Sequence, residues 1–263
     1  MQKLENKVVI ITGAALGLGL ASALEAAKNG ALLSLIDYNA ELLEKAKAQI
    51  LSEYPETKVL TVIADVSDEA AVQKYVKETV DAYGRIDAFY NNAGIEGKQA
   101  PLATYDPEIF KKVIDINLMG SYYGLKYIIP IMQQQNYGRI VNVASVGGIR
   151  GVKNQTPYVA TKHAVSGMTK SAALEYGQYG ITTNAIAPGA ILTPMVAGAF
   201  KQINPENPQA AEDNYAQANP TKRLGRPEEV AKAVVFLLSE DCSYINGQTI
   251  AIDGGQSNSY GDV

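Results

Sequence analysis

Tyr158 and Lys162 stand four residues apart, so on a helix their side chains share one face, one turn apart. The ordinary pKa of a tyrosine is about 10, and a neighbouring ammonium group favours the phenolate and so lowers that pKa. Such a pair can pass a proton to or from a substrate hydroxyl, and Ser145 can hydrogen-bond the same oxygen. The spacing is also common on solvated helix faces, so its meaning depends on the surrounding fold.

A glycine-rich segment follows the first predicted strand, residues 8–11. Gly13 suits a tight turn, Gly17 lets the backbone approach a pyrophosphate, and Gly19 permits close helix packing. The helix expected at 20–29 would offer free N–H groups and its positive dipole end to phosphates. A purely structural turn is the alternative, but a strand before the glycines and a helix after them favour a dinucleotide site.

Asp37 ends the second predicted strand, about twenty residues after the glycines. A carboxylate there can accept hydrogen bonds from both ribose hydroxyls of an adenosine and repels a 2′-phosphate, which predicts NAD(H) rather than NADP(H). Asp37 could instead cap the following helix. Asp65 and Val66 end the third strand and could hold the adenine edge, while residues 91–94 could pass beneath the cofactor.

These residues need a scaffold, and short apolar runs alternating with amphipathic helical patterns predict one. The predicted strands are residues 8–11, 32–36, 59–63, 86–90, 140–143, 181–187 and 249–252. The alternation predicts an α/β fold: one Rossmann domain over residues 1–263, with a doubly wound, seven-stranded parallel sheet and helices on both faces. Residues 190–226 are rich in proline and contain one expected short helix at 210–218. We expect this segment to be a substrate-binding lid within the domain.

Composition excludes several other classes of protein. The chain has 263 residues, a net charge of −4 and one cysteine. These values exclude a disulfide scaffold and argue against a dedicated nucleic-acid binder, and no run is apolar enough for a membrane span. No signal peptide is visible, so we expect a cytoplasmic protein. The single histidine, His163, and the isolated Cys242 predict no metal site.

Taken in order, these motifs resemble the short-chain dehydrogenase/reductase family over essentially the whole chain. The matching positions are Thr12-Gly13-x3-Gly17-x-Gly19, Asp65, Asn91-Asn92-Ala93-Gly94, Asn117, Ser145, Tyr158-x3-Lys162 and Pro188-Gly189. The resemblance implies a catalytic tetrad of Asn117, Ser145, Tyr158 and Lys162. In that tetrad Tyr158 is the acid and base, Ser145 orients the substrate oxygen, and Lys162 lowers the pKa of Tyr158 and binds the nicotinamide ribose. Asn117 would hold a water that links Lys162 to solvent.

Motifs and resemblance together give the expected binding residues. For the cofactor these are Gly13, Leu16, Gly17, Leu18, Gly19, Asp37, Tyr38, Asp65, Val66, Asn92, Ala93, Gly94, Tyr158, Lys162, Pro188, Gly189, Ile191 and Thr193. For the substrate they are Glu96, Val146, Gly147, Gln155 and Met195. We expect Glu96, Arg150 and Gln155 to make the pocket entrance polar. Segments 91–99, 144–151 and 185–195 also resemble a branch of the family that reduces a methylated cyclohexanedione with NADH.

The sequence therefore predicts an NAD(H)-dependent oxidoreductase that interconverts a small ketone, cyclic ketones included, and its secondary alcohol. One alternative is a 3-oxoacyl thioester reductase of fatty acid synthesis. Asp37 argues against it, because those enzymes usually take NADPH. A second alternative is a non-catalytic nucleotide-sensing regulator, against which the intact tetrad argues.

The same sequence predicts contacts with further copies of the chain. The helices expected at 106–135 and 158–179 carry more apolar surface than one sheet face needs, so we expect each to pair with a second subunit. Residues 228–263 are expected to form another interface, and the family resemblance points to a homotetramer. Whether Tyr260 reaches a neighbouring active site is left open by the sequence.

Overall fold

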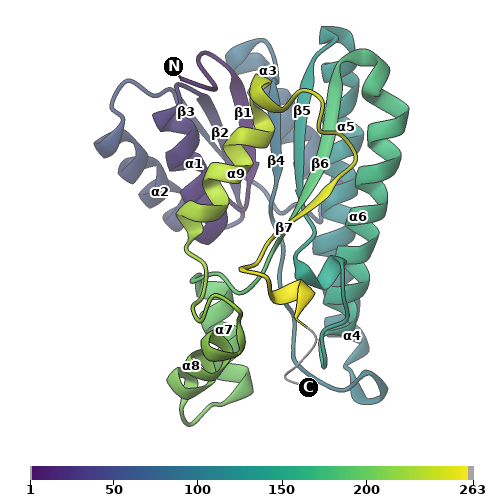
Figure 1. Cartoon of the computed structure of the whole chain (residues 1–263). Helices are drawn as coiled ribbons and strands as arrows, with labels where there is room; N and C mark the ends of the chain where they lie inside the picture. Colours follow the sequence, from purple (N-terminus) through teal and green to yellow (C-terminus); the bar gives the residue numbers. More distant parts are fainter. Residues whose placement is uncertain (1, 260–263) are drawn as a thin grey trace.

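The computed structural model describes residues 2–259 of the chain and contains the expected seven-stranded parallel sheet (Figure 1). The strand order is β3-β2-β1-β4-β5-β6-β7. The strands are β1 (Val8–Thr12), β2 (Leu32–Asp37), β3 (Val59–Ile63), β4 (Ala88–Asn91), β5 (Gly138–Val143), β6 (Ile181–Pro188) and β7 (Thr249–Ile252). The central strands are buried along their whole length, which explains their nearly continuous apolar sequences. The α/β prediction is confirmed.

Helices cover both faces of this sheet. On one face lie α1 (Gly17–Lys28), α2 (Ala40–Glu53) and α9 (Pro227–Leu238), and on the other lie α3 (Glu69–Tyr83), α5 (Gly120–Gln135) and α6 (Thr156–Tyr176). Each face has its own cluster of buried apolar side chains, with Leu43 and Val234 on the first and Val72 and Ile128 on the second. Two buried faces are what a doubly wound sheet requires.

The start of α2 corrects one alternative raised by the sequence. The cap of this helix is Asn39, whose side-chain oxygen accepts a hydrogen bond from the Leu42 N–H at 3.0 Å. Asp37 lies two residues earlier, at the end of β2, and does not cap the helix. Its carboxylate accepts from the Ala15 N–H of the glycine-rich loop and from the Asn39 N–H, and it reaches no N–H group within the helix.

The long helix expected at 106–135 has an irregular middle. It consists of α4 (Pro107–Val113), a π-helical stretch η2 (Ile114–Met119) and α5. π-helical turns inside α-helices occur frequently at functional sites. This one contains Asn117, whose side chain is fully buried.

Residues 190–226 form two helices, α7 (Pro194–Ile203) and α8 (Pro208–Ala218), where the sequence predicted only the second. In Figure 1 the two helices lie together beyond the carboxyl ends of the strands, apart from the layers that cover the sheet. The Thr193 hydroxyl caps α7 and Pro194 takes its first position, so cap and proline mark a start that the apolar pattern left unclear. That this segment acts as a lid stays a prediction.

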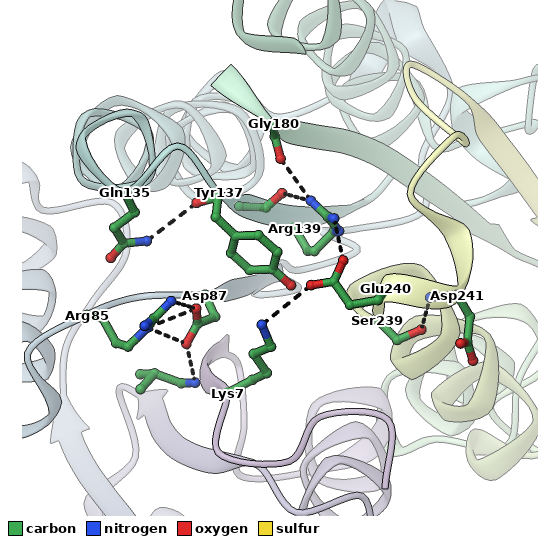
Figure 2. A network of polar contacts seen from close by, with 12 residues as sticks. Lys7, Arg85, Asp87, Gln135, Tyr137, Arg139, Gly180, Ser239, Glu240 and Asp241 are labelled. Atoms are coloured by element: carbon green, nitrogen blue, oxygen red, sulfur yellow. Dashed lines mark hydrogen bonds and ion pairs between the residues drawn. The ribbon is translucent and has the colours of Figure 1, made fainter. Parts of the chain in front are cut away.

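The opposite end of the sheet, where the strands begin, holds a set of polar side chains that we call the amino-end network. It consists of Lys7, Arg85, Asp87, Gln135, Tyr137, Arg139 and Glu240, and Figure 2 shows it from close by. Arg139 is buried and donates to the main-chain oxygens of Gly138 and Gly180 and to Glu240, at 2.8–3.0 Å. The Tyr137 ring lies between Lys7 and Arg139, 4.2 and 4.5 Å from their charged groups.

Between residues 2 and 259 no helix is long and apolar enough to cross a membrane. Within the same range, no three or more His, Cys, Asp or Glu side chains gather where they could hold a metal ion. The expected interface at 228–263 extends beyond the described residues at its last four positions, which include Tyr260.

Candidate active site

A cavity of about 550 Å³ lies at the carboxyl ends of the strands, bounded on one side by the start of α7. β1 pairs with β2 on one side and β4 on the other, so the strand order reverses at this point. Ligands of open α/β sheets bind at such a crevice. The arrangement of the backbone therefore places a crevice at this end of the sheet.

Nearly all residues expected to bind the cofactor line this cavity. They are Gly13, Leu16, Gly17, Leu18, Asp37, Tyr38, Asp65, Val66, Asn92, Ala93, Gly94, Tyr158, Lys162, Pro188, Gly189, Ile191 and Thr193. Ser145 and Met195 line it as well. Gly19 does not: a Cβ on it would lie 2.0 Å from the Gly13 carbonyl oxygen, so it serves the close packing of α1 on the loop.

Hydrogen bonds to the residues that follow β4 fix the conformation of the glycine-rich loop. Gly13 and Gly17 have φ values of +64° and +56°, a region that L side chains rarely adopt. Asn92 donates to the main-chain oxygens of Thr12 and Gly13 at 2.8 and 3.2 Å. The Thr12 hydroxyl in turn accepts from the Asn92 and Ala93 N–H groups. These bonds fix the bare backbone that a pyrophosphate would approach.

Asp37 lies beside the same loop. Its Oδ2 accepts from the Ala15 N–H and its Oδ1 from the Asn39 N–H, both at 3.1 Å. These two bonds orient the carboxylate at the rim of the cavity, next to the largely exposed ring of Tyr38. Each oxygen keeps a second lone pair that can accept from a hydroxyl group. The backbone cradle, the open cavity and this carboxylate fit a dinucleotide.

At the other end of the cavity, Lys162 is buried and donates to the Val143 carbonyl oxygen at 2.8 Å. Burial lowers the pKa of Lys162 from its ordinary 10.5 to about 8. Its Nζ lies 5.6 Å from the centre of the Tyr158 ring. Tyrosine and lysine therefore share one face of α6, as their spacing predicted.

The acidity of Tyr158 differs from the expectation. Burial raises the pKa of Tyr158, a hydrogen bond to Ser145 partly offsets the increase, and the charge of Glu96 adds to it. In the protein by itself the pKa is thus above its usual value, whereas Lys162 was expected to lower it. The physical reason is that removing the phenolate from water outweighs the bond that stabilises it.

Ser145 has an unusual backbone. Its φ is +59° and its ψ 164°, between β5 and the short helix η3 (Val146–Gly148). A residue other than glycine is strained there, and such strain persists only where the surrounding structure enforces it, often at active sites. The Ser145 hydroxyl accepts from the Gly147 N–H at 3.3 Å. The strained turn aims this hydroxyl toward Tyr158.

Asn117 stands behind the cavity and does not line it. Its side-chain amide donates to the Ile95 carbonyl oxygen and accepts from the Ile95 N–H, both at 2.8 Å. These two bonds hold the loop after β4 close to Lys162: a Cβ on Gly94 would lie 3.5 Å from the Lys162 Nζ. The observed contacts of Asn117 thus position this loop, and the expected water relay stays a prediction.

Of the residues expected to bind substrate, four lie outside the cavity lining. Glu96 and Gln155 hydrogen-bond each other, and Glu96 also accepts from Gln99 at 3.0 Å. Burial raises the pKa of Glu96, and the bond from Gln99 lowers it in part. Gly147 stands directly behind the Tyr158 ring, where a Cβ would lie 3.3 Å from ring carbons. Val146, buried in η3, is the fourth.

The expected place of Arg150 was wrong. Its Nη1 donates to the Gln256 carbonyl oxygen at 3.0 Å, and it does not line the cavity. The side chain thus extends to the C-terminal segment, which the sequence gave no reason to place nearby.

Several lining residues were missed by the sequence analysis. They are Ala15, Ile36, Asn39, Leu42, Ala64, Ile95, Lys112, Ile116, Val143, Pro194 and Val196. Most adjoin a motif in sequence and could have been found for that reason. Lys112 and Ile116 come from the helix that leads to Asn117. Their separation of four residues is the signal that puts them on one face.

Comparison with known proteins agrees with this geometry. Residues 13–257 match the family model described as enoyl-(acyl carrier protein) reductase. The chain is 53% identical to levodione reductase of Leifsonia aquatica over 97% of its length and 96% of that protein. It is 36% identical to cyclohexanol dehydrogenase of an Acinetobacter species (97% of each chain). It is 40% identical to a 3-oxoacyl-acyl-carrier-protein reductase of Thermotoga maritima, over 96% of this chain and 98% of that protein.

Solved structures extend the comparison. The crystal structure of levodione reductase superposes with a TM-score of 0.97 at 52% identity, covering 98% of this chain and all of that one. The structure of an NAD⁺-bound xylitol dehydrogenase superposes with a TM-score of 0.91 at 35% identity, and the match covers 96% of this chain and all of that one. The structure of an actinorhodin polyketide ketoreductase with NADPH superposes with a TM-score of 0.92 at 31% sequence identity, and the match covers 98% of this chain and all of that one. The chain therefore belongs to the short-chain dehydrogenase/reductase family, as an oxidoreductase of the alcohol dehydrogenase/carbonyl reductase type.

Proposed function

We propose that this protein uses NAD(H), in preference to NADP(H), to interconvert a small cyclic ketone and its secondary alcohol. Asp37 is the observation that carries the cofactor preference. Two N–H groups hold its carboxylate at the rim of the cavity, and an anion in that position repels a 2′-phosphate. No Lys or Arg stands in the loop from Gly13 to Gly19 to neutralise such a phosphate.

The contacts of the tetrad support the following catalytic roles. When bound, the nicotinamide supplies or accepts the hydride. During reduction the Tyr158 hydroxyl gives its proton to the carbonyl oxygen, and the Ser145 hydroxyl donates a hydrogen bond to that same oxygen. Because the pKa of Lys162 is about 8, most molecules carry its ammonium group at pH 7, where it stabilises the tyrosinate.

The substrate class rests on the pocket beside Tyr158 and on the relatives. Met195 and Val196, at the start of α7, and Ile95, after β4, give this end of the cavity apolar walls. Glu96 lies outside this lining, but its carboxylate is near enough to raise the pKa of Tyr158. A compact apolar ring with one or two carbonyl groups suits such walls. Levodione reductase and cyclohexanol dehydrogenase, both named for cyclic compounds, are among the relatives.

The first test is oxidation of NADH and of NADPH, each with cyclic diketones, vicinal diketones, aryl ketones and acetoacetyl thioesters. We expect fast turnover of a cyclic ketone with NADH. The Asp37→Ser variant should raise kcat/KM for NADPH relative to NADH, whereas Asp81→Asn, at an exposed site on α3, should leave the ratio unchanged. Turnover confined to NADPH and the thioester would overturn the proposal.

That contrary outcome would favour the second candidate, a 3-oxoacyl thioester reductase. One relative with that name is 40% identical over nearly the whole chain. The core motifs are therefore shared by both candidates, and the preference between NADH and NADPH separates them.

We also propose that the protein is a cytoplasmic homotetramer. The tetramer is supported by apolar side chains exposed on the predicted interface helices, among them Tyr122 on α5, Leu174 on α6 and Phe236 on α9. α5 and α6 cover one face of the sheet and α9 the other, so these side chains fit more than one subunit contact. Sedimentation velocity at micromolar concentration checks this, and 28.1 kDa particles alone would contradict it.

A further inference from the structure

The chain folds back on itself after β7, in a segment that we call the C-terminal hook, residues 253–259. Gly254 and Gly255 have φ values of +63° and +90°, and their left-handed backbone reverses the direction of the chain. The Asp253 carboxylate closes the turn by accepting from the N–H groups of Gly255 and Ser257, at 3.0 and 2.7 Å. The hook lies at the end of the sheet that holds the cavity (Figure 1).

The base of residues 190–226 is bonded to this hook. Asn219, which is 4% exposed, donates from its side chain to the Asp253 carbonyl oxygen at 3.1 Å. The approach is close: a Cβ on Gly254 would lie 2.5 Å from the Thr221 hydroxyl oxygen. The end of the segment after α8 is therefore packed directly against the hook.

Gln256 in the hook contacts three segments around the site. Its side-chain amide donates to the Tyr215 hydroxyl on α8. Its main-chain oxygen accepts from Arg150, five residues after Ser145, at 3.0 Å. Its Oε1 lies against the turn at Gly189, where a Cβ would be 2.6 Å away, and Gly189 lines the cavity.

The contact with Tyr215 reaches the substrate end of the cavity through the aromatic packing of the two helices. The rings of Tyr215 on α8 and Phe200 on α7 meet edge to face, with centroids 5.7 Å apart. Phe200 is 3% exposed, and Met195 at the start of the same helix lines the cavity. Packed side chains therefore connect Tyr215 with the helix whose first turn lines the cavity.

Gln256 is only 6% exposed, and its Oε1 has no hydrogen-bond partner among the described residues. The Nε of Arg150 is likewise buried without one. Buried polar atoms without partners cost stability. These two unpaired atoms lie where the hook meets Gly189 and the loop after Ser145, so the packing there is not optimised for hydrogen bonding.

We infer that Gln256 is a positioning residue, which ties residues 190–226 to the loop after Ser145 and to the cofactor turn at Gly189. Through its bonds to Tyr215 and Arg150 it holds α7 and α8 over the cavity, at a fixed position relative to Ser145. Loss of either bond lets the two helices open more often and lets a bound dinucleotide leave faster. This inference rests on the proposed function for the identity of the ligand.

The first experiment uses the protein without ligand. Trypsin can cut after the exposed Lys201 and Lys222 when this part of the chain opens, so the rate of cleavage reports opening. We expect Tyr215→Phe and Gln256→Met to speed cleavage by about two- to tenfold, the range for loss of one hydrogen bond. Gln209→Met, at an exposed position on α8, is the matched control and should cut at the wild-type rate.

The two variants also form a double-mutant cycle. Because Tyr215 and Gln256 hold the two ends of one bond, the double variant should cut no faster than the faster single variant. Effects that multiply would mean that the two residues act independently, and unchanged cleavage in both single variants would overturn the tie itself.

The second experiment measures how fast NADH leaves, by stopped-flow fluorescence. We expect release to accelerate about two- to tenfold in Tyr215→Phe and Gln256→Met, with KM for NADH rising more than kcat falls. The Arg150→Lys variant should release NADH more slowly than Arg150→Met, because lysine can still donate to the Gln256 oxygen. Faster cleavage with unchanged NADH release would show a structural tie only and would overturn the inference. If the wild-type protein bound no NADH, the proposed function would fail instead.

Discussion

The two ends of the sheet treat polar side chains in opposite ways. At the amino ends of the strands, the buried Arg139 bonds through its terminal nitrogens to two carbonyl oxygens and Glu240, although its Nε has no partner among the described residues, and the buried Asp87 pairs with Arg85. At the carboxyl ends, Ser145 has a strained backbone, Lys162 has an ammonium group held in a buried place, and Gln256 has an unpaired oxygen. The same strands connect both arrangements.

This difference separates stability from catalysis. Paired charges at the amino ends lower the energy of the folded chain without offering any group to a ligand. At the carboxyl ends, groups without full partners raise the energy of the folded chain and remain available to one. Variants at the two ends should therefore change different quantities, and the following predictions run from the largest expected effect to the smallest.

Tyr158→Phe should reduce turnover by about a thousandfold, because the variant cannot exchange a proton with the substrate oxygen. Binding of NADH and the thermal midpoint should change little. Tyr137→Phe is the matched change at the amino ends, where the ring between Lys7 and Arg139 is kept, and it should retain full turnover. Steady-state kinetics with NADH titration checks both, and undiminished turnover in Tyr158→Phe would refute the assigned role.

Lys162 should make stability depend on pH. Its pKa is about 8 in the folded protein and 10.5 ordinarily, so between these values the unfolded chain binds more protons. The free energy of unfolding should therefore rise with pH across this window, by up to about 3 kcal/mol relative to Lys162→Met. Urea unfolding of both proteins from pH 7 to 10.5 measures the difference. Parallel curves would show that folding does not lower the pKa of Lys162.

Arg139→Met should lower the free energy of unfolding by about 2 kcal/mol, because two buried carbonyl oxygens and Glu240 lose a charged donor. The value of kcat/KM should stay at the wild-type level, since the site lies at the other end of the strands. Urea unfolding and steady-state kinetics test the two halves of this prediction. A loss of activity without a loss of stability would contradict the separation of the two ends.

Lys7→Met should cost less than about 1 kcal/mol. Lys7 is partly exposed, and its ion pair with Glu240 at 3.4 Å is accessible to water and salt. Its place over the Tyr137 ring adds a modest cation–π attraction. The control, Lys45→Met, removes only an exposed pair on α2 and should have a smaller effect still. Thermal unfolding at low and high salt distinguishes the two variants.

Much of the fold follows from local sequence. Strand positions, the glycine-rich loop and the start of α9 at Pro227 depend on neighbours along the chain, so patterns of a few residues predict them. The first helix of residues 190–226 was missed because its apolar pattern is short and its start depends on the cap at Thr193. The π-helical stretch around Asn117 was also missed, because periodicity alone does not distinguish it from a regular helix.

The site divides in the same manner. Sequence determined which groups are present and on which strand ends they lie: the tyrosine and lysine one turn apart, the aspartate after β2 and the glycines after β1. Tertiary structure alone decided that burial raises the pKa of Tyr158, that Arg150 extends to Gln256, and that Glu96 is bonded to Gln155. The physical reason is the separation along the chain over which each kind of interaction acts. Backbone preferences and helix spacing act over a few residues, whereas desolvation and long side-chain contacts depend on segments brought together from distant parts of the chain.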